Sequence, residues 1–284
     1  MNAEIIAKYY EYLDLSKSRH TLASYRLTIE NYRKQYGDDN LTIDTANNFI
    51  TKQIKQKGLT RSIIVRAYAL FGLFKYGNEP DYLHINIPRV VISDNPAFLY
   101  PEDIDKIISE AIGLLKPLTA YSFDLALRFG EAANSKKADF KLATYKAKVQ
   151  REKQRNPQEQ VLDVRPKYAG IVKEYLEKRK DSNEYLFVTN TLSRKISINE
   201  QHDFAYLCNE TLKLKDRSDS GEPIRFHILR HTRLTWMIAN GKSIEETAKF
   251  AGHTSVTSTM KYLNLASFNG LGIFKKPEIP RDES

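Results

Sequence analysis

Cysteine is almost absent from this chain of 284 residues, in which Cys208 is the only one. A single cysteine excludes an internal disulfide and any cysteine-based metal site, and in its F-A-Y-L-C-N setting it is most simply a small core residue. No apolar run approaches membrane-spanning length, and the first residues carry Glu4 without the basic-then-apolar pattern of a signal peptide. The sequence therefore predicts an intracellular, cytoplasmic protein with no membrane contact.

Motifs that hold metals or nucleotides are also missing. The chain has no H-E-x-x-H zinc motif, no EF-hand loop and no P-loop, so a metal nuclease or a nucleotide hydrolase has little support. We therefore expect neither a metal nor a cofactor. Hydrophobic residues make up 41% of the chain, and its length is enough for two domains, each with a core of its own.

Positive charge is what the chain has in excess. The formal net charge is +9, and residues 136–180 hold 14 Lys and Arg against 6 Asp and Glu, which leaves a net of +8 in that one stretch. A basic surface that neutralises several phosphates binds nucleic acid in a salt-dependent and largely sequence-independent way. This concentration favours a polyanionic partner over a protein-interaction domain whose charge is incidental.

The first 90 or so residues predict a bundle of helices. Apolar and aromatic side chains recur at helical spacing in the stretches 6–13, 22–36, 46–54 and 64–74, and we expect most of them in a core. Residues 82–98 contain two prolines and indicate a linker, so we place a domain boundary between residues 94 and 95.

The segment 227–262 has the pattern helix, glycine break, helix, glycine-histidine break, helix. His227 and Arg230 are three residues apart, so on a helix they project from one face and can reach a single anion. His253 follows Gly252, at which we expect the second helix to end. Reactive side chains therefore lie at or near helix ends.

Tyr262 lies nine residues after His253 in the polar segment T-S-T-M-K-Y, and we expect its phenol at a surface rather than in a core. A phenol near an arginine and two imidazoles, without a carboxylate cluster, indicates an anionic substrate such as a phosphate. Each of these residues alone has an ordinary structural explanation. Their order and spacing as a set favour a site.

Arg128 interrupts an apolar helix predicted over residues 121–134, and a buried arginine needs an anionic partner or a ligand. Glu131, three residues on, could orient it. The alternative is an ordinary surface pair, worth less than about 1 kcal/mol. Further on, residues 142–149 and 161–164 are strand-like and flank a long basic turn, which predicts a hairpin.

With these residues the chain resembles the tyrosine recombinases, also called phage integrases. The motifs H-x-x-R, G-H and a tyrosine nine residues after that histidine are matched, and so are the upstream L-R-x-x-E and the L-R-H-T run of residues 229–232. The matching residues are Leu127, Arg128, Glu131, His227, Arg230, Gly252, His253 and Tyr262. The motifs occur in the family's order, and the resemblance covers most of the chain.

The resemblance implies a mainly α fold with a small β-hairpin or sheet. In such a fold a helical, SAM-like core-binding domain, residues 1–94, and a mixed α+β catalytic domain with a C-terminal tail, residues 95–284, form a C-shaped clamp on double-stranded DNA. It also implies a site-specific recombinase or integrase, associated with the nucleoid. We expect a homotetramer on paired sites, and a monomer or dimer without DNA. The family's tail commonly docks into a neighbouring protomer.

The resemblance further implies the role of each residue. Tyr262 would attack the phosphorus, which forms a 3′-phosphotyrosyl link and frees a 5′-hydroxyl. Arg128 and Arg230 would clamp the phosphoryl oxygens, with Glu131 orienting the former. His227 and His253 would donate hydrogen bonds to the phosphate, and His227 is also a candidate to take the tyrosine proton.

The family's catalytic lysine lies in the β-hairpin, where this chain departs from the usual K-x-G-K turn because it lacks glycine and contains Pro157. We choose Lys153, which lies ahead of the second strand, as the acid for the leaving 5′-oxygen. Any cation of this turn could instead be a plain phosphate contact.

Further cations lie at predicted helix starts, on polar faces or in the hairpin, where DNA contacts are natural. The expected DNA-binding residues are Arg19, His20, Arg26, Lys57, Arg61, Lys148, Arg151 and Arg155. We assign no catalytic role to His84, His202 or His231, and Trp236 is expected in the core.

Two alternatives keep the same fold. A type IB topoisomerase-like enzyme would nick and rejoin DNA without exchanging strands, and a non-catalytic protein would only bind it. The L-R-H-T and G-H motifs favour a recombinase, and the nearly complete set of site residues argues against loss of catalysis.

Overall fold

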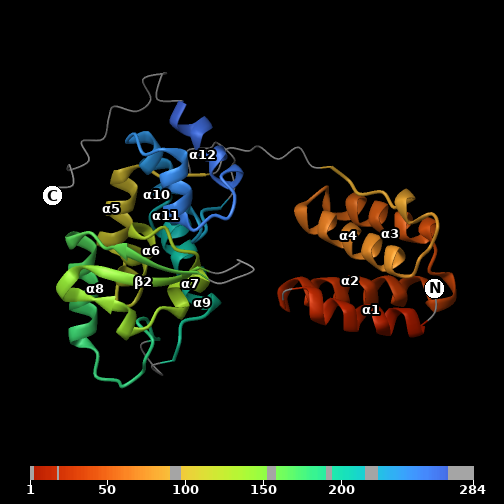
Figure 1. Ribbon diagram of the computed structural model, residues 1–284, viewed down its shortest axis with the longest axis horizontal. Helices are drawn as coiled ribbons and strands as arrows, with labels where there is room; N and C mark the ends of the chain where they lie inside the picture. Colours follow the sequence, from red (N-terminus) through yellow and green to blue (C-terminus); the bar gives the residue numbers. More distant parts are fainter. Residues whose placement is uncertain are drawn as a thin grey trace. The chain divides into compact units, whose positions relative to one another are not determined.

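The computed structural model describes most of the chain, and the protein divides into two compact units, residues 1–92 and 93–284 (Figure 1). The expected boundary, between residues 94 and 95, lies close to this division. Among the described residues, no helix combines the length and the apolar character that crossing a membrane requires. The described ranges are 3–17, 19–89, 97–151, 158–189, 194–214 and 223–267.

In its described residues, the first unit has four α-helices and two short 3-10 turns. They are α1 Ala3–Ser16, α2 Arg19–Tyr36, η1 Asp38–Asn40, α3 Ile43–Lys57, α4 Arg61–Tyr76 and η2 Tyr82–His84. Tyr32 lies at the centre of its core, where the hydroxyl donates a 2.9 Å hydrogen bond to the carbonyl of Thr42 and the ring packs edge-on against Phe49. Because Thr42 is the N-cap of α3, this bond fixes the start of α3 against α2.

The second unit is mainly helical with one small antiparallel sheet, as predicted. Its helices are α5 Pro101–Glu110, α6 Leu115–Asp124, α7 Phe129–Asn134, α8 Pro166–Lys178, α9 Ile198–Tyr206, α10 Ile228–Ala239, α11 Ile244–Ala251 and α12 Thr257–Ser267. The sheet has the order β1 Phe140–Lys141, β2 Lys146–Arg151, β3 Gln158–Asp163. Short turns of other helix types are η3 Lys137–Asp139, η4 Leu142–Thr144 and η5 Leu207–Thr211.

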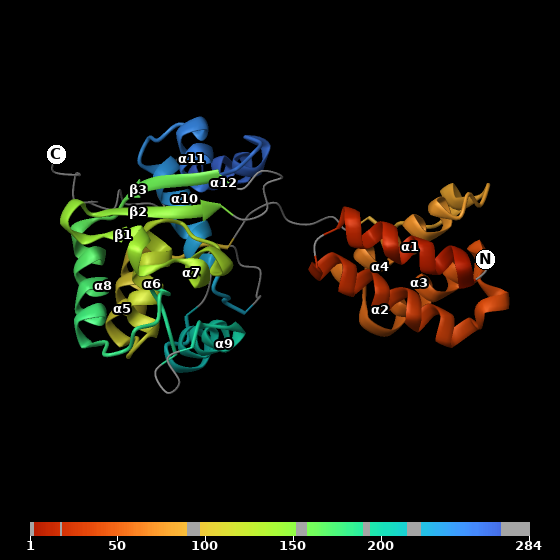
Figure 2. The ribbon, with the colours of Figure 1, turned by 60° about the horizontal axis from the view of Figure 1, so that its bottom comes forward.

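The β2–β3 pair is the predicted hairpin, and Arg151 lies opposite Gln158 at the end where the two strands are connected. Figure 2 shows β3 on the side of the sheet nearest α11, and a hydrogen bond from Gln160 to the carbonyl of Lys249 joins the two elements. The hairpin is therefore fastened through β3 to α11, the helix that precedes His253.

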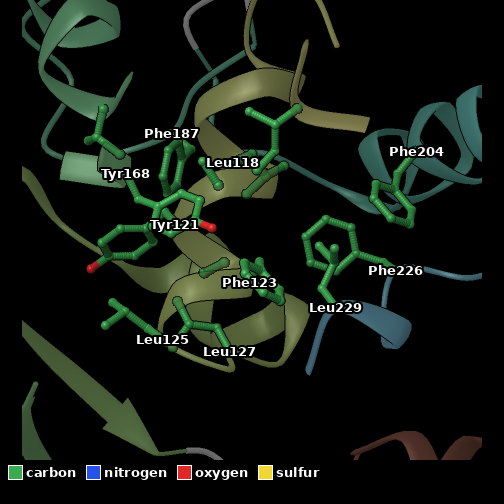
Figure 3. Packing of buried hydrophobic residues seen from close by; sticks show 14 of the residues in the cluster. Leu118, Tyr121, Phe123, Leu125, Leu127, Tyr168, Phe187, Phe204, Phe226 and Leu229 are labelled. Atoms are coloured by element: carbon green, nitrogen blue, oxygen red, sulfur yellow. The ribbon is translucent and has the colours of Figure 1, made fainter. Parts of the chain in front are cut away.

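Helix α6 is the centre of the core of the second unit. Every residue from Pro117 to Asp124 is buried, and Figure 3 shows aromatic side chains of distant segments around Leu118, Tyr121 and Phe123. Cys208 and Trp236 are buried, as the sequence predicts, and the Trp236 indole donates to the carbonyl of Leu99. This all-round burial makes α6 the fixed support on which the segment with Arg128 begins.

Leu118→Ala tests this support. Leu118 is 0% exposed, and removing its side chain leaves a cavity in a packed core, so we expect a loss of about 2–5 kcal/mol in the free energy of unfolding, measured by urea titration. The control is Ile112→Ala, at a side chain that is 84% exposed, where the change stays within about 0.5 kcal/mol. Equal losses in the two variants would contradict this assignment of the core.

Candidate active site

The carboxylate of Glu131, on α7, collects three arginines from three elements. Arg128 donates from Nη1 to Oε1 at 2.7 Å, Arg151 of β2 donates from Nη1 to Oε2 at 2.9 Å, and Nη1 of Arg230 on α10 lies 3.8 Å from Oε2. The predicted pairing of Arg128 with Glu131 is therefore confirmed. Three guanidinium charges on one carboxylate leave a buried positive excess, which a phosphate can neutralise.

Electrostatics keeps Glu131 ionised although it is only 3% exposed. Burial by itself would raise the pKa of this carboxyl. The charge of Arg151, the backbone N–H of Arg128 and the charge of Arg230 outweigh it, so the pKa lies below the ordinary value.

Arg230 is 1% exposed and is held on both sides. Its Nη1 donates to the carbonyl of Ala126 at 2.6 Å, and its Nη2 donates to the carbonyl of Ala251 at 2.7 Å and lies 2.9 Å from Nε2 of His253. Burial, followed by the charge of Arg128, lowers the pKa of Arg230 to about 9. The guanidinium is therefore a buried charge that an incoming anion would stabilise.

Three side chains cap the last carbonyls of α11. Gln160 donates to Lys249, Arg151 donates from Nη2 to Phe250, and Arg230 donates to Ala251. The carbonyl of Lys249 also accepts from the backbone N–H of Gly252, and all three carbonyls lie at the negative end of the helix dipole, where cations are favourable. The capping holds the residues that follow α11, beginning with Gly252 and His253, against the arginine cluster.

The expected DNA contact of Arg151 is corrected by this geometry, because its side chain is 1% exposed. In β2 the alternate residues Ala147, Val149 and Arg151 face the core, and the last of them reaches Glu131. Burial is the largest influence on this guanidinium and lowers its pKa despite Glu131. Arg151 thus belongs to the candidate site and not to a surface that meets DNA.

Gly252 allows Arg151 to pass under the end of α11. It adopts φ 63° and ψ 42°, the left-handed region that favours glycine, and a Cβ there would lie 2.6 Å from Cγ of Arg151. Both the backbone and the close approach therefore require glycine before His253.

His253 is an acceptor in this arrangement. Its Nε2 faces Nη2 of Arg230, which can only donate, so the proton of the neutral ring is on Nδ1 and points to the hydroxyl of Thr259 at 2.7 Å. Burial and the charge of Arg230 lower its pKa to about 3, so the ring is neutral. The sequence predicts that His253 donates a hydrogen bond to the phosphate. For this, its hydrogen bond with Arg230 must first break, and its proton must lie on Nε2.

Tyr262 is buried, which corrects the expectation of a surface phenol. It is 1% exposed and belongs to a small apolar cluster with Ala126, Leu234, Ile238 and Ala251. The reason is tertiary, because α12 packs along α10 and turns Tyr262 inward together with Thr259, one turn earlier. Burial raises the pKa of the phenol above its ordinary value, and Arg230 and Arg128 oppose this.

His231 is the residue that the sequence interpretation missed. Its Nδ1 lies 2.6 Å from the hydroxyl of Tyr262, and its ring packs perpendicular to that of His227 with centroids 4.5 Å apart. Burial, followed by the charge of His227, lowers the pKa of His231 to about 2. A spacing of four from His227, which places both on one helix face, was the available signal.

Apart from His227, whose ring packs against that of His231, the other expected residues lie away from the arginine cluster or outside the described ranges. His227 is exposed at the N-cap of α10, and Lys148 pairs with Glu159 at 2.8 Å. Lys153 and Arg155 lie outside the described residues, as do the side chains of Arg19 and His20. Within the described ranges, no group of three or more metal-binding side chains is placed to hold an ion.

In the first unit, Arg26 is paired with Asp14 at 2.6 Å and lies over the ring of Tyr10, so its charge is partly satisfied within the protein. Arg61 is exposed at the start of α4. Lys57 lines a polar hollow of about 410 Å³, together with Lys34 and Arg66. The hollow thus brings Lys34 and Arg66 beside Lys57, which is one of the expected DNA contacts.

This chain is similar in sequence and in fold to known proteins. Residues 97–267, more than half of the chain, match the phage integrase family. The tyrosine recombinase XerA of Thermococcus kodakarensis is 27% identical over 264 residues, which cover 91% of this chain and 90% of that protein. A crystal structure of XerA recombinase aligns with a TM-score of 0.53 at 19% identity, covering 95% of this chain and 97% of the other. A lambda integrase tetramer bound to a Holliday junction aligns with a TM-score of 0.71 at 17% identity, covering 91% and 76%. Both alignments show a shared fold.

Gly252→Ala tests the passage of Arg151 beneath α11. The added methyl group meets the arginine side chain and forces a left-handed alanine, so we expect a loss of about 2–4 kcal/mol in urea unfolding. The matched control is Gly170→Ala within α8, where a Cβ meets nothing within 4 Å, and which should be neutral or stabilising by up to about 1 kcal/mol. Similar behaviour of the two variants would show that Gly252 has no such constraint.

Glu131→Gln tests the shared carboxylate through pH. Because the pKa of Glu131 is lower in the folded protein than its unfolded value of about 4.3, its stabilisation is complete above that pH and is lost as the pH falls through the folded value. We expect the free energy of unfolding of the variant to be lower than that of the wild type by about 3 kcal/mol near pH 7. This difference should narrow below about pH 4.

Urea unfolding of both proteins across this pH range measures the gap. Glu159→Gln, which removes the exposed partner of Lys148, is the control and should change stability by less than about 1 kcal/mol at every pH. A gap that widened in acid would mean that the carboxylate is not held ionised by the arginines.

Proposed function

Because the chain belongs to the phage integrase family, we propose that it is a site-specific DNA recombinase that cleaves and rejoins DNA strands through a 3′-phosphotyrosyl intermediate. One observation carries the proposal. Three guanidiniums share the single carboxylate of Glu131, and the charges of two of them, Arg230 and Arg128, act on the phenol of Tyr262. A buried positive excess beside a phenol suits nucleophilic attack on a phosphodiester.

The arginines have different tasks in this reaction. Arg128 is the most accessible, with 20% of its side chain exposed, and is placed to meet the phosphate first. Arg230 stabilises the charge that develops on the non-bridging oxygens once a phosphate oxygen replaces His253 at its Nη2. Arg151 keeps its contacts to Glu131 and Phe250 and positions the others.

The reaction needs two proton transfers. The Tyr262 oxygen bonds to phosphorus as the bond to the 5′-oxygen breaks, so the phenol loses a proton and the leaving oxygen gains one. His227, at the exposed N-cap of α10, is the candidate acceptor, and Lys153 of the hairpin turn is the candidate donor. Attack of a second DNA 5′-hydroxyl on the phosphotyrosine reverses the step, so no external energy source is consumed.

We infer that the first unit binds duplex DNA away from the cleavage site. The polar hollow with Lys34, Lys57 and Arg66 is a surface at which phosphates can be neutralised, and this supports a DNA-binding role for residues 1–94. We further infer four protomers on two paired sites, since strand exchange needs two cuts on each of two duplexes. A nucleoid-associated location in the cytoplasm follows from the substrate.

Covalent trapping tests the proposal. Wild type, Tyr262→Phe and, as a matched control, Tyr145→Phe are mixed with nicked duplexes carrying candidate sites, in the presence of EDTA, and resolved on a denaturing gel. Tyr145 is a half-exposed tyrosine of the same unit. We expect a protein–DNA adduct from wild type and Tyr145→Phe, and a loss of at least about a thousandfold in Tyr262→Phe, because the nucleophile is missing.

The other outcomes separate the alternatives. An adduct from Tyr262→Phe would move the nucleophile to another residue. Nicking and rejoining without exchange of strands between duplexes would indicate a topoisomerase-like enzyme. Tight, salt-dependent binding without an adduct at any site would indicate a protein that only binds DNA.

A further inference from the structure

We propose that His231 is a positioning residue for Tyr262: in the DNA-free protein its imidazole holds the phenol in a buried resting position, and DNA cleavage requires this hydrogen bond to break. The inference rests on the proposed role of Tyr262 as the nucleophile. It assigns a role to a histidine of the L-R-H-T run that lies beside Arg230, within the candidate site.

Burial of the phenol shows that this position is not the reacting one. A nucleophile must approach the phosphorus to about 3–3.5 Å, with the leaving group in line behind it. Tyr262 is 1% exposed, so water barely reaches it, and a phosphate within a DNA duplex is far larger than water. The phenol must therefore leave the cluster formed by Ala126, Leu234, Ile238 and Ala251 before it can attack.

The bond to His231 is what makes the buried position stable. Nδ1 lies 2.6 Å from the hydroxyl of Tyr262, the hydrophobic side chains of the cluster offer no hydrogen-bond partner, and Arg230 and Arg128 act on the phenol through their charge. A buried hydroxyl without a partner is strongly disfavoured, so without the imidazole the phenol would favour a more exposed position. His231 is itself buried, and its low pKa keeps it neutral, so the bond links two neutral groups.

A chain of contacts connects this position to the phosphate site. His253 bonds both Arg230 and Thr259, and Thr259 lies one turn before Tyr262 on α12. When a phosphate oxygen takes the place of His253 at Arg230, the link through His253 that ties the start of α12 to Arg230 is lost. DNA can shift the equilibrium only by binding the released state more tightly, and the uncompensated arginine charge supplies that difference.

Chemical modification of the DNA-free protein tests the restraint without relying on catalysis. Wild type, His231→Leu and His231→Asn are treated with tetranitromethane, and nitration of each tyrosine is followed by peptide mass spectrometry. In wild type, Tyr262 should be as protected as Tyr121, which is 0% exposed, whereas Tyr145, which is 44% exposed, should react. In His231→Leu we expect nitration of Tyr262 to rise about tenfold, on the scale of one lost buried hydrogen bond.

Two variants separate positioning from general support of the fold. Asparagine can place a hydrogen-bonding atom near the site of Nδ1, so His231→Asn should restore the protection. His202→Leu, the same change at an exposed histidine of α9, should leave Tyr262 protected. If His231→Leu also exposes Tyr121, the variant is unfolded, and His231→Gln, whose amide reaches the Nε2 position instead, replaces it with the same expected result.

Adduct formation with pre-bound nicked DNA gives the second measurement. Release of the phenol should make the single-turnover rate of His231→Leu several-fold faster than that of wild type. A wild-type level of Tyr262 protection in His231→Leu, or an adduct rate reduced tenfold or more, would overturn the proposal. If wild type forms no adduct, the proposed function fails, whereas the nitration result still decides whether His231 restrains Tyr262.

Discussion

The ion cluster around Glu131 joins the parts of the catalytic unit that are far apart in the chain. Its carboxylate receives Arg128 from the N-cap of the same helix, Arg151 from the hairpin and the longer-range charge of Arg230 from α10. Breaking a buried pair by removing one partner is strongly destabilising, so each of these elements restrains the others. Because three positive charges meet one negative charge, the same cluster that orders the unit also leaves it ready for an anion.

The end of α11 shows how stability and chemistry use the same side chains. Arg151 and Arg230 cap carbonyls that the helix cannot satisfy by itself, and Gly252 leaves room for the first of them. As a result, both Nη atoms of Arg230 already have hydrogen-bond partners within the protein. Binding of a phosphate must therefore exchange existing contacts rather than fill an open site.

The DNA-free arrangement is for this reason a resting one. His253 accepts from Arg230 instead of donating to a substrate, and the phenol of Tyr262 lies in an apolar cluster against His231. His253 thus bonds Arg230 and Thr259, and Tyr262 bonds His231, so both site residues have hydrogen-bond partners within the protein. On the proposal that His231 restrains Tyr262, the site would gain its reactive geometry only when DNA binds, and this would limit cleavage of the wrong phosphodiester.

The sequence by itself determined most of the helices, the hairpin, the order of the site residues and the pairing of Arg128 with Glu131, because these depend on periodicity and on spacings of three or four residues. The single helix expected over residues 121–134 was wrong, because α6 ends at Asp124 and α7 begins at Phe129 with Arg128 as its N-cap. The tertiary structure alone decided that Arg151 is buried beneath a helix end 99 residues away, and that Tyr262 meets His231 across 31 residues. A polar segment such as T-S-T-M-K-Y indicates a surface only until another helix packs on it. Local patterns contain no information about which distant side chain completes a hydrogen bond, and those distant partners set the resting state of this site.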